Sequence, residues 1–214
     1  MERLEKLYEG KAKILYNTSD PELMVQYFKD DASAFDGKKK GTIVDKGVMN
    51  NHMSSRIFQY LEGEGIKTHF LKNVNDREML VKKLDIIPIE VVLRNVAAGS
   101  LCKRLGIEEG LILKKPILEF FYKSDPLGDP MINECHVDVF EWATKQEVEV
   151  LKAEGIRINN LMIKFFQERH IRLVDFKLEF GRHNGEVILG DEISPDGCRL
   201  WHLETNEKMD KDRF

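Results

Sequence analysis

The segment LVDFKLEFGRHNGEVILGDEIS, Leu173 to Ser194, predicts a β-hairpin whose first strand has one apolar and one charged face. Successive side chains of a strand point to opposite sides of the sheet. One side carries residues typical of a packed core: Phe176, Leu178 and Phe180. The other side carries an acid, a base and an acid: Asp175, Lys177 and Glu179. This charged row on a half-buried strand indicates a ligand-binding surface.

The register of the hairpin decides which acidic side chains meet. Asn184-Gly185 is a strong turn signal, and a plain two-residue turn there places Leu178 opposite Asp191. A connection one residue longer, with Gly185 left-handed in a bulge, pairs Glu179 with Asp191 instead. Facing carboxylates repel unless a proton or a cation lies between them, and magnesium binds a few carboxylates together with phosphate oxygens. We therefore favour the bulged register and a magnesium site over a surface hairpin with ordinary charges.

Composition and missing motifs exclude several classes of protein. The chain has 214 residues, 42% of them hydrophobic, enough for one or two domains, and its net charge of -4 does not suggest nucleic-acid binding. The three cysteines form no CxxC pair, so we expect no disulfide, no thiolate zinc site and a cytoplasmic location. No apolar run approaches membrane-spanning length. The phosphate loops GxGxxG and GxxxxGK[ST], the GxSxG elbow and HExxH are all absent.

The order of expected elements indicates a mixed α+β protein, not a regular βαβ alternation. Apolar spacing predicts helices over residues 50–63 and 145–169, and a first strand over residues 7–16. Strand-rich character gives way to mixed character near residue 85, which predicts two domains: 1–85 and 86–214.

Two lysines in YEGKAKILY, residues 8–16, suggest a bound anion. Lys11 and Lys13 are two positions apart on the expected strand, so their ammonium groups share one face. Adjacent like charges repel, and nucleotide phosphates between them would remove the repulsion. The alternative, a lysine-guarded edge strand, is favoured when this segment is taken alone.

The segment PIEVVLRNVAAGS, Pro88 to Ser100, places charged side chains in an apolar strand. A buried Arg94 requires an anion, either Glu90 or a ligand. Gly99-Ser100, at the expected start of a helix, offers backbone N–H groups and a hydroxyl to a phosphate. A structural Arg94–Glu90 pair with a serine cap is equally compatible with this segment.

Together these segments resemble the phosphoribosylaminoimidazole-succinocarboxamide synthase (SAICAR synthetase) family. The similar stretches follow the family order over essentially the whole chain: LYEGKAK, SAFDGKKK, KGVMNNHMS, LVKKLD, IPIEVVLRNVAAGSL, DPMINE, LVDFKLEFG, LGDEISPDGCRLW and DKDRF. The resemblance implies an ATP-dependent ligase of purine biosynthesis that joins L-aspartate to 5-aminoimidazole-4-carboxylate ribotide (CAIR). It also implies the family's fold: a small β-rich N-terminal nucleotide-binding domain, a larger α+β domain and ATP between them, distantly like ATP-grasp enzymes and kinases. By analogy with the family we expect a homodimer.

The resemblance further implies roles for individual residues. ATP would contact Lys11, Ala12, Lys13, Leu15, Val81, Lys82, Ile86 and Lys123. The 5′-phosphate of CAIR would be bound by Arg94, Ser100 and Arg199, and Mg²⁺ by Glu179 and Asp191. Three catalytic residues would surround the reacting carboxylate: Lys177, Asp175 and Asp196, with either aspartate accepting the proton of the incoming amine. The loop with Asp36, Gly37 and Lys38 would close over the site and help to receive aspartate.

Two features depart from the family pattern. His202 stands where relatives commonly have an aspartate after the tryptophan, and the sequence ends at DKDRF, where relatives usually continue into a further helix. Two other functions remain as alternatives, a small-molecule kinase with the same ATP site and a nucleotide-sensing module. Phosphate release that depends on aspartate would separate a ligase from a kinase, and the anion-binding arginines argue against a sensing module.

Overall fold

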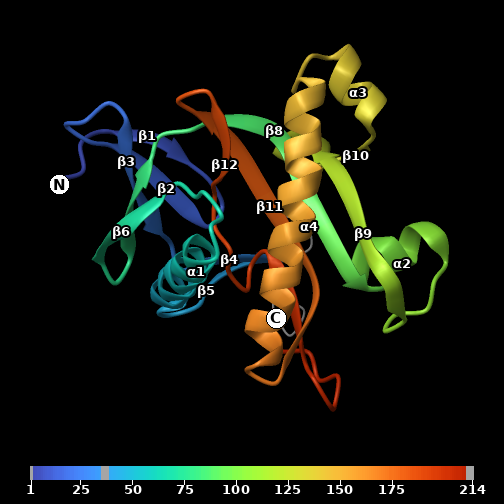
Figure 1. Cartoon of the computed structure of the whole chain (residues 1–214). Helices are drawn as coiled ribbons and strands as arrows, with labels where there is room; N and C mark the ends of the chain where they lie inside the picture. Colours follow the sequence, from blue (N-terminus) through green and yellow to red (C-terminus); the bar gives the residue numbers. More distant parts are fainter. Residues whose placement is uncertain (1, 35–38, 211–214) are drawn as a thin grey trace. The chain divides into compact units, whose positions relative to one another are not determined.

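The computed structural model describes residues 2–34 and 39–210, which form two compact units of mixed α+β structure (Figure 1). The first unit comprises Met1–Asp85 and Gly181–Ser194, and the second comprises Ile86–Phe180 and Pro195–Phe214. The sequence assigned the segment Gly181–Ser194 to the second domain. The structure instead makes it part of the first unit.

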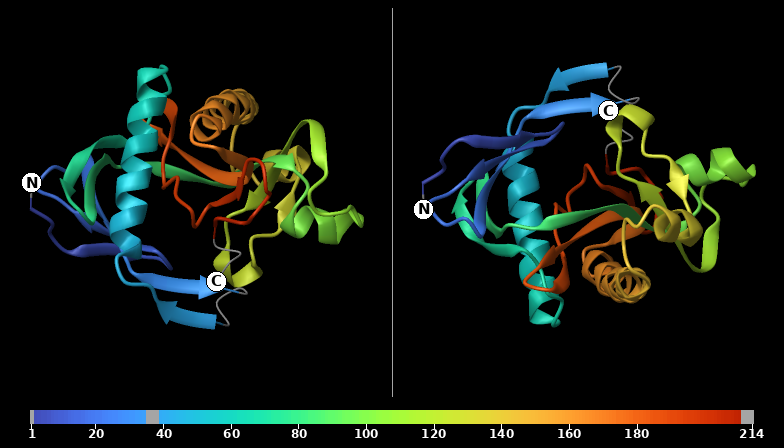
Figure 2. Two further views of the ribbon diagram at one scale, coloured as in Figure 1. Left: turned by 90° about the horizontal axis from the view of Figure 1, so that it is seen from below. Right: turned by 90° about the horizontal axis from the view of Figure 1, so that it is seen from above.

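The first unit is built on an antiparallel sheet with a helix packed against it. The strand order is β1 (Lys6–Glu9), β2 (Lys13–Asn17), β3 (Leu23–Phe28), β7 (Glu78–Lys82) and β6 (Phe70–Asn75). Helix α1 (Lys46–Gly63) lies against β3, β6 and β7 (Figures 1 and 2), and its Ile57, Phe58 and Leu61 are fully buried. This confirms the helix predicted over residues 50–63, which begins four residues earlier than expected. A separate two-stranded ladder joins β4 (Asp31–Ala34) to β5 (Lys39–Thr42).

The strand expected over residues 7–16, with an early break at Gly10, is in fact two strands, because the chain reverses direction directly after Gly10. The backbone N–H of Gly10 donates to the carbonyl of Lys13 at 2.9 Å and closes a tight turn. Strands β1 and β2 then pair antiparallel on either side of that turn. Glycine is a common turn residue and is unfavourable inside a strand.

The second unit is built on a sheet with the strand order β10-β9-β8-β11, and β13 pairs with β11. Its strands are β8 (Asp85–Val96), β9 (Ile112–Tyr122), β10 (Met131–Ile132), β11 (Ile171–His183) and β13 (Cys198–His202). Its helical segments are α2 (Gly99–Leu105), the 3₁₀ turn η1 (Asp125–Leu127), α3 (Glu134–Val139) and α4 (Lys145–Gln167). Helix α4 begins at Thr144, whose hydroxyl caps the first turn in a reciprocal capping box with Glu147.

Helix α4 packs closely on the sheet because it carries a glycine at the contact (Figure 2). A Cβ on Gly155 would lie 3.3 Å from a methyl of Val91 and 3.4 Å from a methyl of Leu118. These residues belong to β8 and β9, so the glycine lets the helix backbone approach both strands. The helix predicted over residues 145–169 is confirmed and ends two residues earlier.

Strand β11 confirms the alternation predicted from its sequence. Phe176, Leu178 and Phe180 are each 1% exposed and belong to the core. The opposite face is also largely covered, because Asp175 is 4% and Glu179 is 2% exposed. Charged groups are costly to bury unless they are paired, so the partners of this face are the central question of the site.

Strand β12 (Glu186–Leu189) pairs with residues 67–69 within the first unit. The Leu189 N–H donates to the Lys67 carbonyl at 3.0 Å, and the Leu189 carbonyl accepts from the His69 N–H at 2.9 Å. These bonds flank a parallel bridge between Thr68 and Leu189. Because this pairing joins segments far apart in the chain, the hairpin sequence alone gave no sign of it.

His202 has a structural role at the end of β13. Its Nδ1 accepts backbone N–H groups of Glu204 and Thr205 at 3.4 and 3.3 Å. Cys102, Cys135 and Cys198 are not joined in disulfides. Within residues 2–34 and 39–210, none of the helices combines the length and the apolar character needed to cross a bilayer.

Candidate active site

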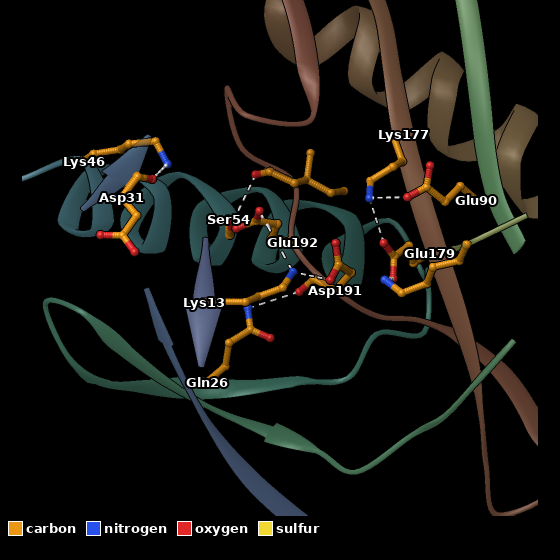
Figure 3. A network of polar contacts seen from close by, with 12 residues as sticks. Lys13, Gln26, Asp31, Lys46, Ser54, Glu90, Lys177, Glu179, Asp191 and Glu192 are labelled. Carbon is orange, nitrogen blue, oxygen red and sulfur yellow. Dashed lines mark hydrogen bonds and ion pairs between the residues drawn. The ribbon is translucent and has the colours of Figure 1, made fainter. Parts of the chain in front are cut away.

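Lys177 lies between two buried glutamates of the second unit (Figure 3). Its Nζ is 2.6 Å from Glu90 Oε1 and 2.8 Å from Glu179 Oε1, and Lys123 Nζ is 2.5 Å from Glu179 Oε2. Burial raises the pKa of the Glu90 carboxyl, and the Lys177 ammonium partly offsets this. Two ammonium groups and two carboxylates therefore compensate one another on the polar face of β11.

Arg94 is buried and binds two carboxylates and a hydroxyl. Its Nε donates to Glu119 Oε2 at 2.7 Å, one terminal nitrogen donates to Asp175 Oδ2 at 2.9 Å, and the other donates to Ser100 Oγ at 3.0 Å. Arg199 binds the same Asp175 carboxylate at 3.0 Å. The Asp175 carboxylate therefore lies between two guanidinium groups. Every group in this cluster other than Ser100 and Arg199 is less than one-tenth exposed.

Strand register brings these charges together. Asp175 of β11 lies directly opposite Arg199 of β13. On the neighbouring pair, Val92 of β8 lies opposite Glu119 of β9, so Glu119 is the diagonal neighbour of Arg94. Diagonal neighbours are within reach of long side chains, which explains the Arg94–Glu119 contact.

The Arg94–Glu90 pair considered from the sequence is wrong. Glu90 and Arg94 are four residues apart on one strand, which separates them by about 13 Å. Glu90 pairs with Lys177 instead. The sequence correctly required an anion for Arg94 but offered no means of choosing Glu119.

Gly99 lets the Arg199 guanidinium lie directly against the backbone beside Ser100. A Cβ at Gly99 would be 2.6–2.8 Å from three atoms of that guanidinium, and the backbone φ of +55° also favours glycine. The structure thus brings Arg94, Ser100 and Arg199 together at the start of α2. These are the three residues that the sequence assigned to phosphate binding.

In the first unit, Lys13 pairs with the acidic segment that follows β12 (Figure 3). Its ammonium contacts the Asp191 carboxylate and lies 3.9 Å from Glu192 Oε1. The Gln26 amide donates to the Asp191 carbonyl at 3.3 Å. Burial lowers the pKa of the neighbouring His69 to about 3, so this imidazole is neutral at pH 7.

The strand positions of the two N-terminal lysines differ from both interpretations of the sequence. Lys11 precedes β2 and therefore does not share a strand face with Lys13. Strand β2 is flanked by β1 and β3, so Lys13 does not guard a sheet edge. Its acidic neighbours, not an edge position, account for its location.

The bulged turn expected in the hairpin is also wrong. Strand β11 ends at His183 and β12 begins at Glu186, so only Asn184 and Gly185 connect them. Both residues have a positive φ, at 50° and 81°. This is the two-residue turn whose twist suits a hairpin. Strand β12 ends at Leu189, and Asp191 follows with a left-handed φ of 61°. The direction of the Asp191 side chain is therefore set by a local backbone feature and not by strand alternation.

The other residues expected at the site occupy varied environments. Leu15 lies on β2, Val81 on β7 is fully buried, and Lys82 donates to the Thr68 carbonyl at 3.0 Å. Ala12 lies in the turn before β2, and Ile86 lies on β8 in the second unit. Asp196 lies in the turn before β13, where the Gly197 carbonyl accepts the backbone N–H of Lys177 at 3.1 Å. The loop residues Asp36, Gly37 and Lys38 lie outside the described residues.

Three residues that contact the clusters were missed: Glu119, Arg104 and Gln26. Glu119 stands in the apolar stretch ILEFFY, so it gives the same signal that singled out Arg94, a charge within a core strand. Arg104 and Gln26 have no comparable sequence signal.

The donor groups are suitable for magnesium, although no cluster of three metal-binding side chains occurs within residues 2–34 and 39–210. Magnesium is usually held by one or two carboxylates together with phosphate oxygens and water. Glu179 and Asp191 supply such carboxylates, and each already contacts a cation, Lys177 and Lys13 respectively. Each carboxylate, taken by itself, is a donor of the type that magnesium accepts.

The fold and these buried charge clusters define an α+β enzyme that acts on anionic ligands. The chain belongs to the SAICAR synthetase family, whose sequence profile matches residues 6–214. The phosphoribosylaminoimidazole-succinocarboxamide synthase of Pelodictyon phaeoclathratiforme is 58% identical over 214 residues, which cover all of this chain and 91% of that protein. Its counterpart from Clostridium acetobutylicum is 56% identical with the same coverage.

Solved structures agree with the sequence comparison. The phosphoribosylaminoimidazole-succinocarboxamide synthase of Ehrlichia chaffeensis matches with a TM-score of 0.95 and 52% identity, over 98% of this chain and 90% of that chain. A SAICAR synthetase in complex with ADP matches with a TM-score of 0.94 and 46% identity at the same coverage. The chain is accordingly an ATP-dependent ligase of purine biosynthesis. The kinase alternative is not favoured, and the nucleotide-sensing alternative is wrong.

Proposed function

We propose that this enzyme joins L-aspartate to the carboxylate of CAIR and converts ATP to ADP and phosphate. One observation carries the proposal: Asp175 and Lys177 are two residues apart on one face of β11. Asp175 is bound by two guanidinium groups, and Lys177 is bound by glutamates. Side chains at two such positions are about 7 Å apart, so one ligand can contact an anion-binding cluster and a lysine cluster together. Relatives that share 54–58% identity carry the name of this activity.

The chemistry requires activation of the carboxylate. A carboxylate oxygen of CAIR attacks the γ-phosphorus of ATP, ADP departs, and an acyl phosphate forms. The amine of aspartate then attacks the acyl carbon, inorganic phosphate departs, and the amine loses a proton as the amide forms. Both steps demand mainly positioning and charge neutralisation from the protein.

Lys177 is the residue best suited to offset charge on the transferring phosphoryl group. Its ammonium is held by Glu90 and Glu179 at 2.6 and 2.8 Å, which restricts its position without a ligand. A preorganised cation stabilises developing charge at little reorganisation cost. Its side chain is 33% exposed, so the ammonium group is not sealed in the core.

The three phosphate-site residues have different tasks in this proposal. Arg94 is buried, and each of its three donor nitrogens already has a protein acceptor. We assign it to holding Ser100 and Asp175 in place. Ser100 is exposed and the Arg199 side chain is 20% exposed, so these two contact the 5′-phosphate of CAIR.

Asp196 is the better candidate for accepting the proton of the aspartate amine. Asp175 receives hydrogen bonds from two guanidinium groups, which stabilise its charge and occupy its oxygens. The turn that carries Asp196 is hydrogen-bonded to the backbone of Lys177. Asp196 therefore lies close to Lys177, the residue proposed to offset charge on the transferring phosphoryl group.

Glu179 and Asp191 are the proposed magnesium ligands, and the ion would offset the negative charge of the nucleotide phosphates. The remaining nucleotide contacts are proposed for Lys11, Ala12, Lys13, Leu15, Val81, Lys82, Ile86 and Lys123. The segment Asp36–Lys38 is proposed to exclude water from the acyl phosphate and to help bind aspartate. We also propose a homodimer in the cytoplasm, and light scattering after size-exclusion chromatography tests the dimer.

An ADP-release assay tests the proposed reaction. With ATP, magnesium and CAIR present, aspartate should allow stoichiometric release of ADP, phosphate and the succinocarboxamide. Succinate, which has the same two carboxylates but no amine, is the matched control and should give no amide product. Rapid multiple-turnover ADP release that is unchanged by aspartate would contradict the ligase reaction.

A further inference from the structure

Arg104, a residue of α2 without an assigned role, is fixed beside the proposed phosphate-binding residues. One terminal nitrogen donates to Ser100 Oγ at 3.2 Å, and the other donates to the Glu119 carboxylate. The guanidinium carbon lies 5.7 Å from the centre of the Phe121 ring. The side chain is nevertheless 30% exposed, so it is held in position without being buried.

Glu119 joins Arg104 to the buried cluster. Its Oε2 accepts from Arg94 and its Oε1 accepts from Arg104, so one 6%-exposed carboxylate orients two guanidinium groups. Glu119 thereby partly neutralises two cations that would otherwise repel each other at close range. It keeps both arginines directed at the same hydroxyl.

The hydroxyl of Ser100 is consequently directed outward. It accepts one hydrogen bond from Arg94 at 3.0 Å and one from Arg104 at 3.2 Å. A serine hydroxyl has two acceptor positions and one donor. Both acceptor positions are occupied by guanidinium donors, so its proton is available to an external acceptor. Ser100 is exposed, which leaves room for one.

The local charge balance also favours an anion. Three guanidinium groups, those of Arg94, Arg104 and Arg199, face two carboxylates, Asp175 and Glu119. In these contacts the guanidinium groups outnumber the carboxylates, three to two. A guanidinium group can bind a phosphate with two parallel hydrogen bonds, which a lysine cannot reproduce.

We propose that Arg104 is a further phosphate-binding residue of this enzyme and that Glu119 holds it in place. The inference rests on the proposed binding of a ribotide phosphate at Ser100 and Arg199. Arg104 adds a third donor group to that site and makes it selective for a phosphate monoester over the unphosphorylated ligand.

The test compares Arg104→Gln with Arg199→Gln and with the surface control Arg157→Gln. Arg157 lies on α4, and its side chain is 46% exposed. Arg104→Gln should raise KM for CAIR at least about tenfold, while KM for ATP stays within about twofold. Ribose 5-phosphate should lose inhibitory strength by a similar factor, whereas inhibition by ribose should not change. A merely structural role would affect the two inhibitors equally.

The comparison separates failure of this inference from failure of the proposed function. If Arg199→Gln raises KM for CAIR but Arg104→Gln behaves like Arg157→Gln, Arg104 does not bind phosphate and the site at Ser100 stands. If neither Arg199→Gln nor Arg104→Gln affects CAIR or ribose 5-phosphate, the phosphate site itself is misplaced. Arg104→Lys keeps a positive charge near Glu119, so this variant is expected to fold even if Arg104→Gln does not. Arg104→Lys should raise KM for CAIR by a smaller factor than Arg104→Gln does. An unchanged KM in Arg104→Lys would also overturn the proposal.

Discussion

Replacing Gly99 with alanine should move the guanidinium of Arg199 away from the phosphate-binding position. The new Cβ would lie 2.6–2.8 Å from three atoms of that guanidinium, well inside normal contact distance. The end of an arginine side chain can shift more easily than a strand backbone. We therefore expect a displaced Arg199 and an intact fold.

Two effects of this substitution have different magnitudes. At a φ of +55°, any L-residue other than glycine costs about 1–2 kcal/mol in stability. Loss of a hydrogen bond from a charged group costs about 1.5–3 kcal/mol, which corresponds to a roughly 10- to 150-fold increase in KM for CAIR. Urea unfolding measures the first effect, and initial rates at varied CAIR measure the second.

Gly106→Ala is the matched control for the backbone effect. Gly106 ends α2 with a φ of +65°, and a Cβ there would meet no atom within 4 Å. The two variants should therefore lose similar stability, and only Gly99→Ala should show a raised KM for CAIR. Equal KM values in the two variants would refute the assigned position of Arg199.

Three further substitutions follow from the paired charges. Lys177→Ala should abolish turnover while thermal unfolding remains cooperative, and a wild-type rate would remove its proposed role. Arg94→Ala should cost about 3–5 kcal/mol in urea unfolding, because two buried carboxylates lose a guanidinium partner; a loss below about 1 kcal/mol would contradict this. Hydrogen bonds from Arg77 hold the pKa of Asp30 at about 2. The stability that the Arg77–Asp30 pair contributes should be complete above about pH 4 and should be lost as the pH falls toward 2. Asp30→Asn should flatten that part of the plot of unfolding free energy against pH. An unchanged slope would count against the Arg77–Asp30 pair.

The periodic features of this protein follow from its sequence alone. Alternation in LVDFKLEFG predicted an apolar and a charged face of β11, and the apolar face lies in the core as expected, but Asp175 and Glu179 of the charged face are buried as well. Apolar spacing predicted α1 and α4 to within a few residues. The family stretches singled out Arg94, Ser100 and Arg199, which the structure brings together. These features are local, because side-chain direction follows from the backbone period of each element.

The tertiary structure alone decided which charges are partners. Arg94 binds Glu119, 25 residues away, and Asp175, 81 residues away, instead of Glu90 on its own strand. These partners depend on the registers between β8 and β9 and between β11 and β13, which backbone hydrogen bonds between distant segments establish. Asp191 likewise has a partner far away in the sequence, because it contacts Lys13 of β2. A one-dimensional pattern fixes the face on which a side chain lies, but the opposing charge comes from another part of the chain.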